Sequence, residues 1–215
     1  MSEHLIVSID SDYCENPAES ECNWRLISYG TRHVAFEHPD TLFRVTRENG
    51  WLEFNPRDPG LRRRLDVGLA FHLSYYEHGL CSWFRKGCGG PGTNCRFDGV
   101  VHAGLLVFEH GPSAIGAKTY AERAADADRF LKQYTDWCNG NGLSFTVRTN
   151  TGDYVDGGCG GYYGSDYETV VNHAVGAVSD LITQGMPWTV SPESLHEYGL
   201  NTALRKLFPT QEYKA

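Results

Sequence analysis

The sequence predicts an α+β fold in which a mostly antiparallel sheet carries two main helices from the C-terminal half of the chain. Three observations support this prediction. Apolar and polar residues alternate in the first half, as in half-buried strands. Apolar residues recur at helical spacing in the second half. The predicted strands follow one another directly, which favours hairpins over the β-α-β units of a parallel sheet.

The strand pattern is clearest at residues 67–75, where apolar side chains alternate with small or polar ones. A strand is also predicted at 100–109, and Gly104 inside it indicates a bulge or a close approach of two backbones. Further strands are predicted at 5–9, at 25–36 with a turn around Gly30, and at 42–46. The three arginines at 62–64 are expected on a solvated turn.

The first predicted helix covers residues 118–138. Thr119 and Glu122 have the spacing of a capping box, in which each side chain closes a free amide of the other residue. The glycines after Asn139 end the helix. Its apolar stripe consists of Tyr120, Ala124, Ala127, Leu131, Tyr134 and Cys138.

A hairpin is predicted next, from a strand at 143–147 and a turn at 150–153. The glycines of "GGCGGYYG" (157–164) are interpreted as turn residues that lead into the second helix. Ser165 and Glu168 suggest a capping box at the start of that helix, which is expected to end at Gly185. A short terminal helical segment is predicted from residue 191.

Length and composition indicate one domain over residues 1–215, with N-terminal strands and loops at 1–66, a core at 67–185 and a C-terminal helical tail at 186–215. The chain is acidic, with a net charge of −8, which argues against general nucleic-acid binding. No export signal or membrane-spanning run is expected. Seven cysteines in such a chain predict reduced thiols in the cytoplasm.

The stretch "HGLCSWFRKGCGGPGTNCRFD" (78–98) has three interpretations. It is read first as a pliable connection with reduced thiols, and no cofactor is favoured. A zinc-stabilised interaction module is one alternative, because His78 and Cys81 have ligand spacing, although Cys88 and Cys95 are farther apart than usual. A thiol enzyme is the other alternative, in which Cys95, or Cys159 elsewhere, acts with His78 and an aspartate such as Asp98.

The segments "FHLSYYEHGL", "CRFDGVVHAGLLVFE", "YTDWCNGNGLSFTV" and "GDYVDGGCGGYYGSD" resemble a family of small uncharacterised proteins encoded by bacteriophages and related mobile elements. The resemblance covers roughly residues 71–166. The chain departs from the family pattern at Glu77, Phe97 and Gly160. The resemblance implies an intracellular viral setting and no particular chemistry. The matching positions are Tyr76, Glu77, His78, Cys95, Phe97, Asp98, Gly104, Tyr134, Gly140, Asp156, Cys159, Gly161, Tyr162, Tyr163 and Gly164.

Several of these positions end or begin predicted elements, so they are expected to gather in one hollow at a rim of the sheet. The alternative is that the aspartates satisfy turn amides and the tyrosines wall the core. We expect a phage-borne, non-enzymatic binding protein in the host cytoplasm, with a host or defence protein or a small ligand as its partner, and the oligomeric state is left open. The expected ligand-binding residues are Tyr76, His78, Asp98, Asp156, Tyr162 and Tyr163.

Overall fold

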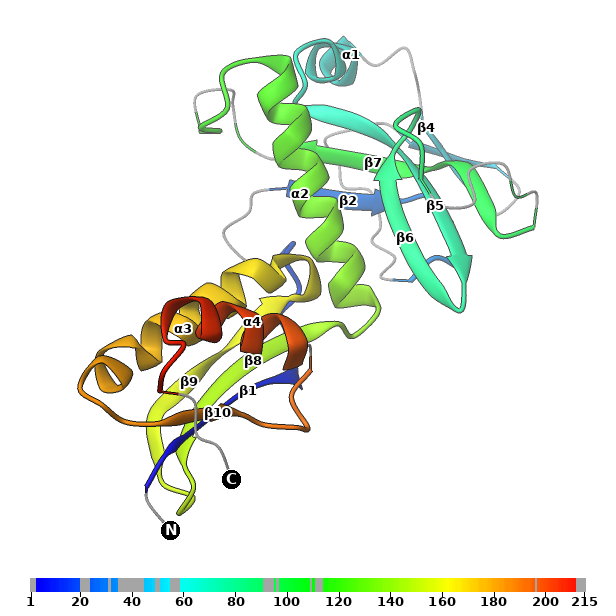
Figure 1. Ribbon diagram of the computed structural model, residues 1–215. Coiled ribbons are helices and arrows are strands. Elements are labelled where there is room, and N and C mark those ends of the chain that lie inside the picture. The colour runs from blue at the N-terminus through cyan, green and yellow to red at the C-terminus, as the bar shows by residue number, and fades with distance from the viewer. Residues whose placement is uncertain are drawn as a thin grey trace. The chain divides into compact units, whose positions relative to one another are not determined.

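The computed structural model of the protein describes residues 3–19, 24–30, 32–34, 45–48, 51–54, 59–90, 95, 97–108, 110, 114–195 and 197–211. At 45–48, 51–54, 156 and 157 only the backbone is described. The fold is α+β, as predicted (Figure 1). Its contacts divide into two compact units. We call residues 15–139 the central unit, and residues 1–14 with 140–215 the terminal unit.

The central unit is built on an antiparallel sheet in the order β2-β7-β5-β6. Its strands are β2 (Trp24–Ser28), β5 (Ala70–His78), β6 (Leu80–Arg85) and β7 (Gly99–Phe108). Helix α2 (Tyr120–Cys138) lies across the strands (Figure 1), and its apolar stripe packs against one face of the sheet. Leu61 of helix α1 (Pro59–Asp66) packs in a second cluster with Ile27, Ala70 and Leu105. A separate hairpin pairs β3 (Val45–Glu48) with β4 (Trp51–Phe54).

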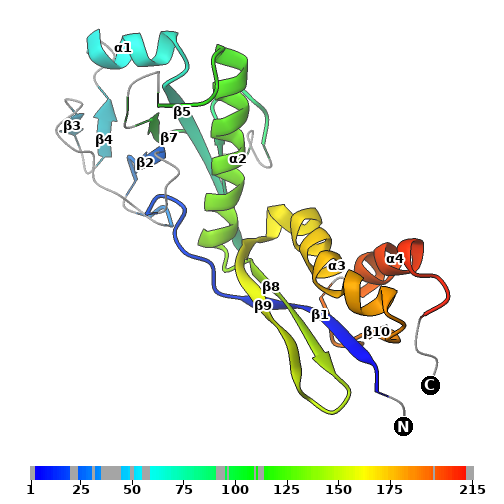
Figure 2. The same cartoon turned by 90° about the vertical axis from the view of Figure 1, so that its left-hand side faces the viewer.

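The terminal unit has a sheet in the order β10-β1-β8-β9. Strands β1 (Leu5–Asp12), β8 (Gly142–Thr149) and β9 (Tyr154–Tyr163) pair antiparallel, and β10 (Trp188–Val190) joins β1 in parallel. A 3-10 turn, η1 (Gly164–Asp166), precedes α3 (Tyr167–Thr183), and α4 (Glu197–Leu207) follows β10. Figure 2 shows both helices on one side of this sheet, where they share its core.

The division of contacts differs from the boundaries that the sequence suggested after residues 66 and 185. Residues 186–215 are not only a helical tail, because β10 extends the sheet next to β1. Leu200 and Leu204 of α4 are fully buried in the same core as Leu5 and Val7 of β1. The N-terminal strand and the C-terminal segment therefore stabilise each other. That the whole chain forms one domain stays a prediction.

Two local predictions are confirmed by the contacts. Thr119 and Glu122 form the expected capping box, with the Glu122 amide donating to Thr119 Oγ1 at 3.2 Å and the Thr119 amide donating to Glu122 Oε2 at 3.0 Å. Gly104 pairs with Ser28 of β2, and a Cβ atom there would lie 2.3 Å from the carbonyl oxygen of Ile27. Only glycine allows β2 and β7 to approach so closely.

Several other local predictions are wrong. The arginines at 62–64 belong to α1 and not to a turn. The first part of the 78–98 stretch is not a pliable connection, because 80–85 form β6. The glycines at 157–161 lie within β9 and not in a turn. The pairing of β9 with β8 shifts register there, and Gly158 and Gly161 have positive φ angles, as in β-bulges. The second helix has Asp166, the last residue of the 3-10 turn, at its N-cap position instead of Ser165.

Other predicted elements are present with different boundaries. The strand predicted at 67–75 begins at residue 70, and the terminal helix begins at residue 197 and not at 191. The strand predicted at 25–36 ends at residue 28, and residues 31, 35 and 36 lie outside the described ones. Residues 42–44 of the strand predicted at 42–46 also lie outside them, and β3 begins at residue 45.

The outer edge of β6 in the central sheet is closed by side chains of α2 and of its C-cap residue, Asn139. The amide of Cys81 donates to Asn139 Oδ1 at 2.9 Å, and Asn139 Nδ2 donates back to the carbonyl oxygen of Cys81 at 2.9 Å. The amide of Trp83 donates to Thr135 Oγ1 at 3.1 Å. Arg85, two residues farther, forms a bidentate ion pair with Asp128 at 2.6 and 2.7 Å. Strand β6 is therefore held on both of its edges.

His33 is buried in an aromatic cluster of the central unit. Its ring lies 4.4 Å from the Tyr75 ring and 5.4 Å from the Trp83 ring, between centroids. Its Nδ1 is 2.6 Å from Ser28 Oγ, which satisfies one ring nitrogen. Burial lowers the pKa of His33 to about 4, against the smaller opposite effect of the Glu77 charge.

We predict from this shift that the protein loses stability as the pH falls from about 6.5 to about 4. In this window the unfolded chain binds a proton at residue 33 and the folded chain does not, so the loss amounts to about 3 kcal/mol. Urea unfolding at a series of pH values measures it. His33→Gln should reduce the slope in this window, and His72, whose pKa burial also lowers, contributes part of the remainder. His78→Gln, at an exposed position, should keep the full slope. An unchanged slope in His33→Gln would contradict the assignment.

Candidate functional site

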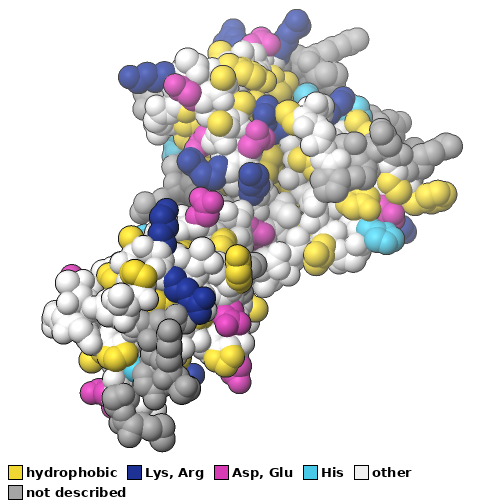
Figure 3. All heavy atoms as spheres, in the orientation of Figure 1, with side chains coloured by type: hydrophobic (Ala, Val, Ile, Leu, Met, Phe, Trp, Pro, Cys, Tyr) yellow, Lys and Arg dark blue, Asp and Glu magenta, His cyan; other side chains and the backbone are white. Residues whose placement is uncertain are grey.

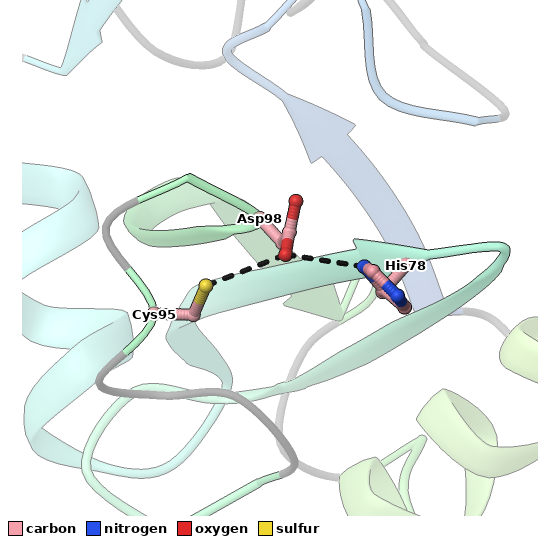
Figure 4. Close-up of polar contacts among 3 residues, drawn as sticks. All are labelled: His78, Cys95 and Asp98. Carbon is pink, nitrogen blue, oxygen red and sulfur yellow. Dashed lines mark hydrogen bonds and ion pairs between the residues drawn. The ribbon is translucent and has the colours of Figure 1, made fainter.

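Three residues proposed from the sequence for thiol chemistry meet at a single carboxylate oxygen (Figure 4). His78 Nδ1 lies 3.3 Å from Asp98 Oδ2, and Cys95 Sγ donates to the same oxygen at 3.4 Å. The His78 side chain is 76% exposed and that of Asp98 32%. Cys95 is half-buried. We call these three residues the Asp98 cluster.

The hairpin of β5 and β6 explains why the Asp98 cluster forms. Gly79, with a φ of 79°, turns the chain immediately after His78. The other neighbour of β5 is β7, which starts at Gly99 opposite Tyr76. The amide of Glu77 donates to the carbonyl oxygen of Asp98 at 2.9 Å. This pairing brings Asp98 beside His78, although twenty positions separate them in the chain.

The order of contacts in the Asp98 cluster does not favour a cysteine enzyme that uses His78 as its base. In a thiol triad the imidazole lies between the nucleophile and the carboxylate, takes the thiol proton and is oriented by the acid. Here the carboxylate lies between the thiol and the imidazole. A negatively charged neighbour opposes formation of a thiolate. The contacts of Asp98 are therefore those of a carboxylate that accepts hydrogen bonds near a turn, and they do not activate Cys95 as a nucleophile.

The residues proposed as zinc ligands come from different segments, with His78 at the end of β5, Cys81 on β6, Cys88 in the turn after β6 and Cys95 before β7. Cys81 is buried on the side of α2, where its thiol is hydrogen-bonded to that of Cys138. This bond lowers the pKa of Cys81, and the same bond together with burial raises the pKa of Cys138. Cys88 is exposed. Within the described part of the chain, no group of three or more His, Cys, Asp or Glu is arranged to hold a metal ion.

The remaining proposed residues lie on β9 of the terminal unit. Tyr162 Oη is 2.6 Å from Nδ1 of His173 on α3. Burial raises the pKa of Tyr162 to about 12, and a hydrogen bond and the charge of the exposed Cys159 act in the same direction. Tyr163 pairs with Gly142, and Asp156 pairs through its backbone with Val147, while the Asp156 side chain lies outside the described atoms.

The six residues that were expected to line one hollow therefore belong to two different units. Tyr76, His78 and Asp98 belong to the central unit, and Asp156, Tyr162 and Tyr163 belong to the terminal unit. Tyr76 is half-buried on β5, between Ser82 of β6 and Gly99 of β7. That the six residues line one hollow stays a prediction.

A pocket of about 380 Å³ lies on the central sheet, and the sequence analysis did not anticipate it. We call it the Phe84 pocket. Its apolar lining comes from three adjacent strands, and the turn after β6 supplies the rest. Gly90 of this turn packs against the Phe84 ring, where a Cβ atom would lie only 2.7 Å from the ring carbons. The lining residues are Ser74, Tyr75, Phe84, Lys86, Gly87, Gly89, Val100 and Val101.

An irregularity in the sheet opens the Phe84 pocket. The pairing of β5 with β7 shifts between Leu73 and Tyr75, so that Tyr75 faces Val100 instead of His102. Ser74, inside the shift, donates to the carbonyl oxygen of Val101 at 3.0 Å. The glycines at 87 and 89, with φ angles of 85° and 66°, let the turn fold back beside Phe84. The glycine-rich sequence after β6 is the feature of the sequence that could have predicted the turn beside the pocket.

A second hollow, of about 570 Å³, lies between α2 and the segment 114–117. Asp126 and Arg129 in its lining pair with each other, and Asp126 also accepts the indole N–H of Trp24 at 2.8 Å. Asp126 and Arg129 thus already have hydrogen-bond partners within the protein. The Phe84 pocket is the better candidate for a ligand.

No protein-family model, no curated protein and no solved structure matches the chain. Among the described helices, none combines the length and apolar character needed to cross a membrane. A function of either site is therefore inferred from the geometry of its residues alone.

The geometry of the Asp98 cluster predicts an increase in Cys95 reactivity when the acid is neutralised. In Asp98→Asn the thiol loses a negatively charged neighbour, so alkylation by iodoacetamide at neutral pH should become about three- to ten-fold faster. Mass spectrometry of each cysteine peptide measures the rate, and the exposed Cys88 and Cys159 serve as internal references. Slower alkylation of Cys95 would indicate that Asp98 activates the thiol, as the enzyme hypothesis requires.

Proposed function

We propose that the protein is a non-enzymatic binding protein that takes a small ligand in the Phe84 pocket. The observation that carries this proposal is the composition of the pocket, which has an apolar wall of aromatic and valine side chains with Lys86 at one side. Its volume of about 380 Å³ lies within the range of small-molecule sites. Such sites are mostly apolar, with a few polar groups that fix the orientation of the ligand.

The order of contacts in the Asp98 cluster favours binding over catalysis. Asp98 lies between Cys95 and His78, and the two have no contact with each other in the cluster. On the face shown in Figure 3, basic and acidic side chains are interspersed. A protein partner in the host, such as a defence factor, is the other target that the sequence suggested.

The setting of this function comes from the resemblance to bacteriophage-encoded proteins, and we propose that the protein acts in the cytoplasm of an infected cell. The cysteines that the structure describes are free thiols, which agrees with a reducing compartment.

The proposal predicts that the Phe84 pocket binds aromatic probes of matching size. Naphthalene-2-carboxylate and naphthalene-2-carboxamide should shift the amide resonances of Ser74, Phe84 and Val101 in an NMR titration. Val101, which is 50% exposed, lines the pocket, so Val101→Trp should fill it and remove binding. Val155→Trp is the matched control, since Val155 is a strand residue of similar exposure in the other unit, 39%.

Binding of at least one probe to the wild type and to Val155→Trp, but not to Val101→Trp, would support the proposed function. The proposal fails if neither probe binds, or if both bind Val101→Trp as tightly as they bind the wild type.

A further inference from the structure

Basic side chains gather beside the Phe84 pocket. Lys86 lines the pocket, and its Nζ lies 3.0 Å from Nε2 of His102 on β7. The amide of Lys86 donates to the carbonyl oxygen of His72 at 2.8 Å, so Lys86 and His72 are neighbours on adjacent chain segments. We call Lys86, His72 and His102 the basic cluster. Its members come from three neighbouring segments of one sheet.

The electrostatic environment of the basic cluster is positive. After burial, the charges of Lys86 and His102 are the further causes that lower the pKa of His72. Lys86 forms no ion pair with a carboxylate among the residues that the structure describes, and its ammonium is hydrogen-bonded to the imidazole of His102.

An exposed lysine ammonium without a carboxylate partner attracts an anion, and Lys86 Nζ has N–H donors beyond the one that it directs at the His102 ring. A lysine ammonium binds carboxylate or phosphate as a point charge and adapts to either geometry. Since Lys86 belongs to both the pocket and the basic cluster, one ligand can contact both. Its apolar part would lie against Phe84 and the valines, and its charged group would reach the ammonium.

We propose that the Phe84 pocket binds small molecules that carry a carboxylate or phosphate group on an apolar, ring-sized body, with the Lys86 ammonium binding the anionic group and His102 holding that ammonium in place. This inference rests on the proposed function and specifies the ligand class of the same pocket.

Isosteric probes test the inference. Affinities of naphthalene-2-carboxylate, 2-naphthyl phosphate and naphthalene-2-carboxamide are measured by calorimetry on the full chain. The two anions should bind about ten-fold more tightly than the amide, the expected value for one charged hydrogen bond. Lys86→Gln should remove this difference, and Lys86→Arg should keep it. Lys132→Gln, which removes an exposed lysine of α2, is the control for net charge and should leave all affinities unchanged.

The outcomes separate the inference from the function on which it rests. If the amide binds the wild type as tightly as both anions, and Val101→Trp removes all three, the pocket is a ligand site and the anionic class is wrong. If the anions bind more tightly but Lys86→Gln keeps the preference, the assignment to Lys86 is wrong. If only the carboxylate or only the phosphate shows the preference, that head group is the one recognised. If no probe binds, the proposed function fails together with the inference.

Discussion

The hydrogen bonds between α2 and the outer edge of β6 are the constraint on which the central unit depends. An edge strand presents unpaired amides, and each buried one left without an acceptor costs about 1–3 kcal/mol. Here Thr135 and Asn139 accept from Trp83 and Cys81. The match is geometric, because four residues of a helix rise about 6 Å and two residues of a strand advance about 6.7 Å. Side chains four residues apart on a helix can therefore accept from alternate amides of a strand edge.

This edge contact places both candidate sites. Once β6 is fixed on α2, its opposite face presents Phe84, and the following turn presents Lys86 beside the shifted pairing of β5 and β7. The same hairpin ends at His78, which meets Asp98 because β7 starts on the other side of β5. The Phe84 pocket and the Asp98 cluster are thus two consequences of one hairpin, which is held by a helix that contributes no residue to either.

Local patterns were sufficient to predict the fold class, the α2 helix with its cap, and the close approach at Gly104, because each depends on neighbours in the chain. The glycine-rich segment of β9 was misread as a turn, since glycine favours turns and bulges alike and only its partner strand decides between them. The sequence suggested that His78 and Asp98 act together, because their residue types suit a thiol enzyme. It could not show that Asp98 lies between Cys95 and His78, because this depends on how the strands pair. The Phe84 pocket was missed, because it depends on a register shift between strands far apart in the sequence.

Amide hydrogen exchange at Cys81 and Trp83 tests the central claim most directly. If α2 closes the edge of β6, these two amides exchange as slowly as those of Leu106 and Val107 in the interior strand β7, and Thr135→Val and Asn139→Ala each accelerate the amide that they leave unpaired. Fast exchange of both amides in the wild type, at the rate of an open edge, would show that the helix does not hold the strand.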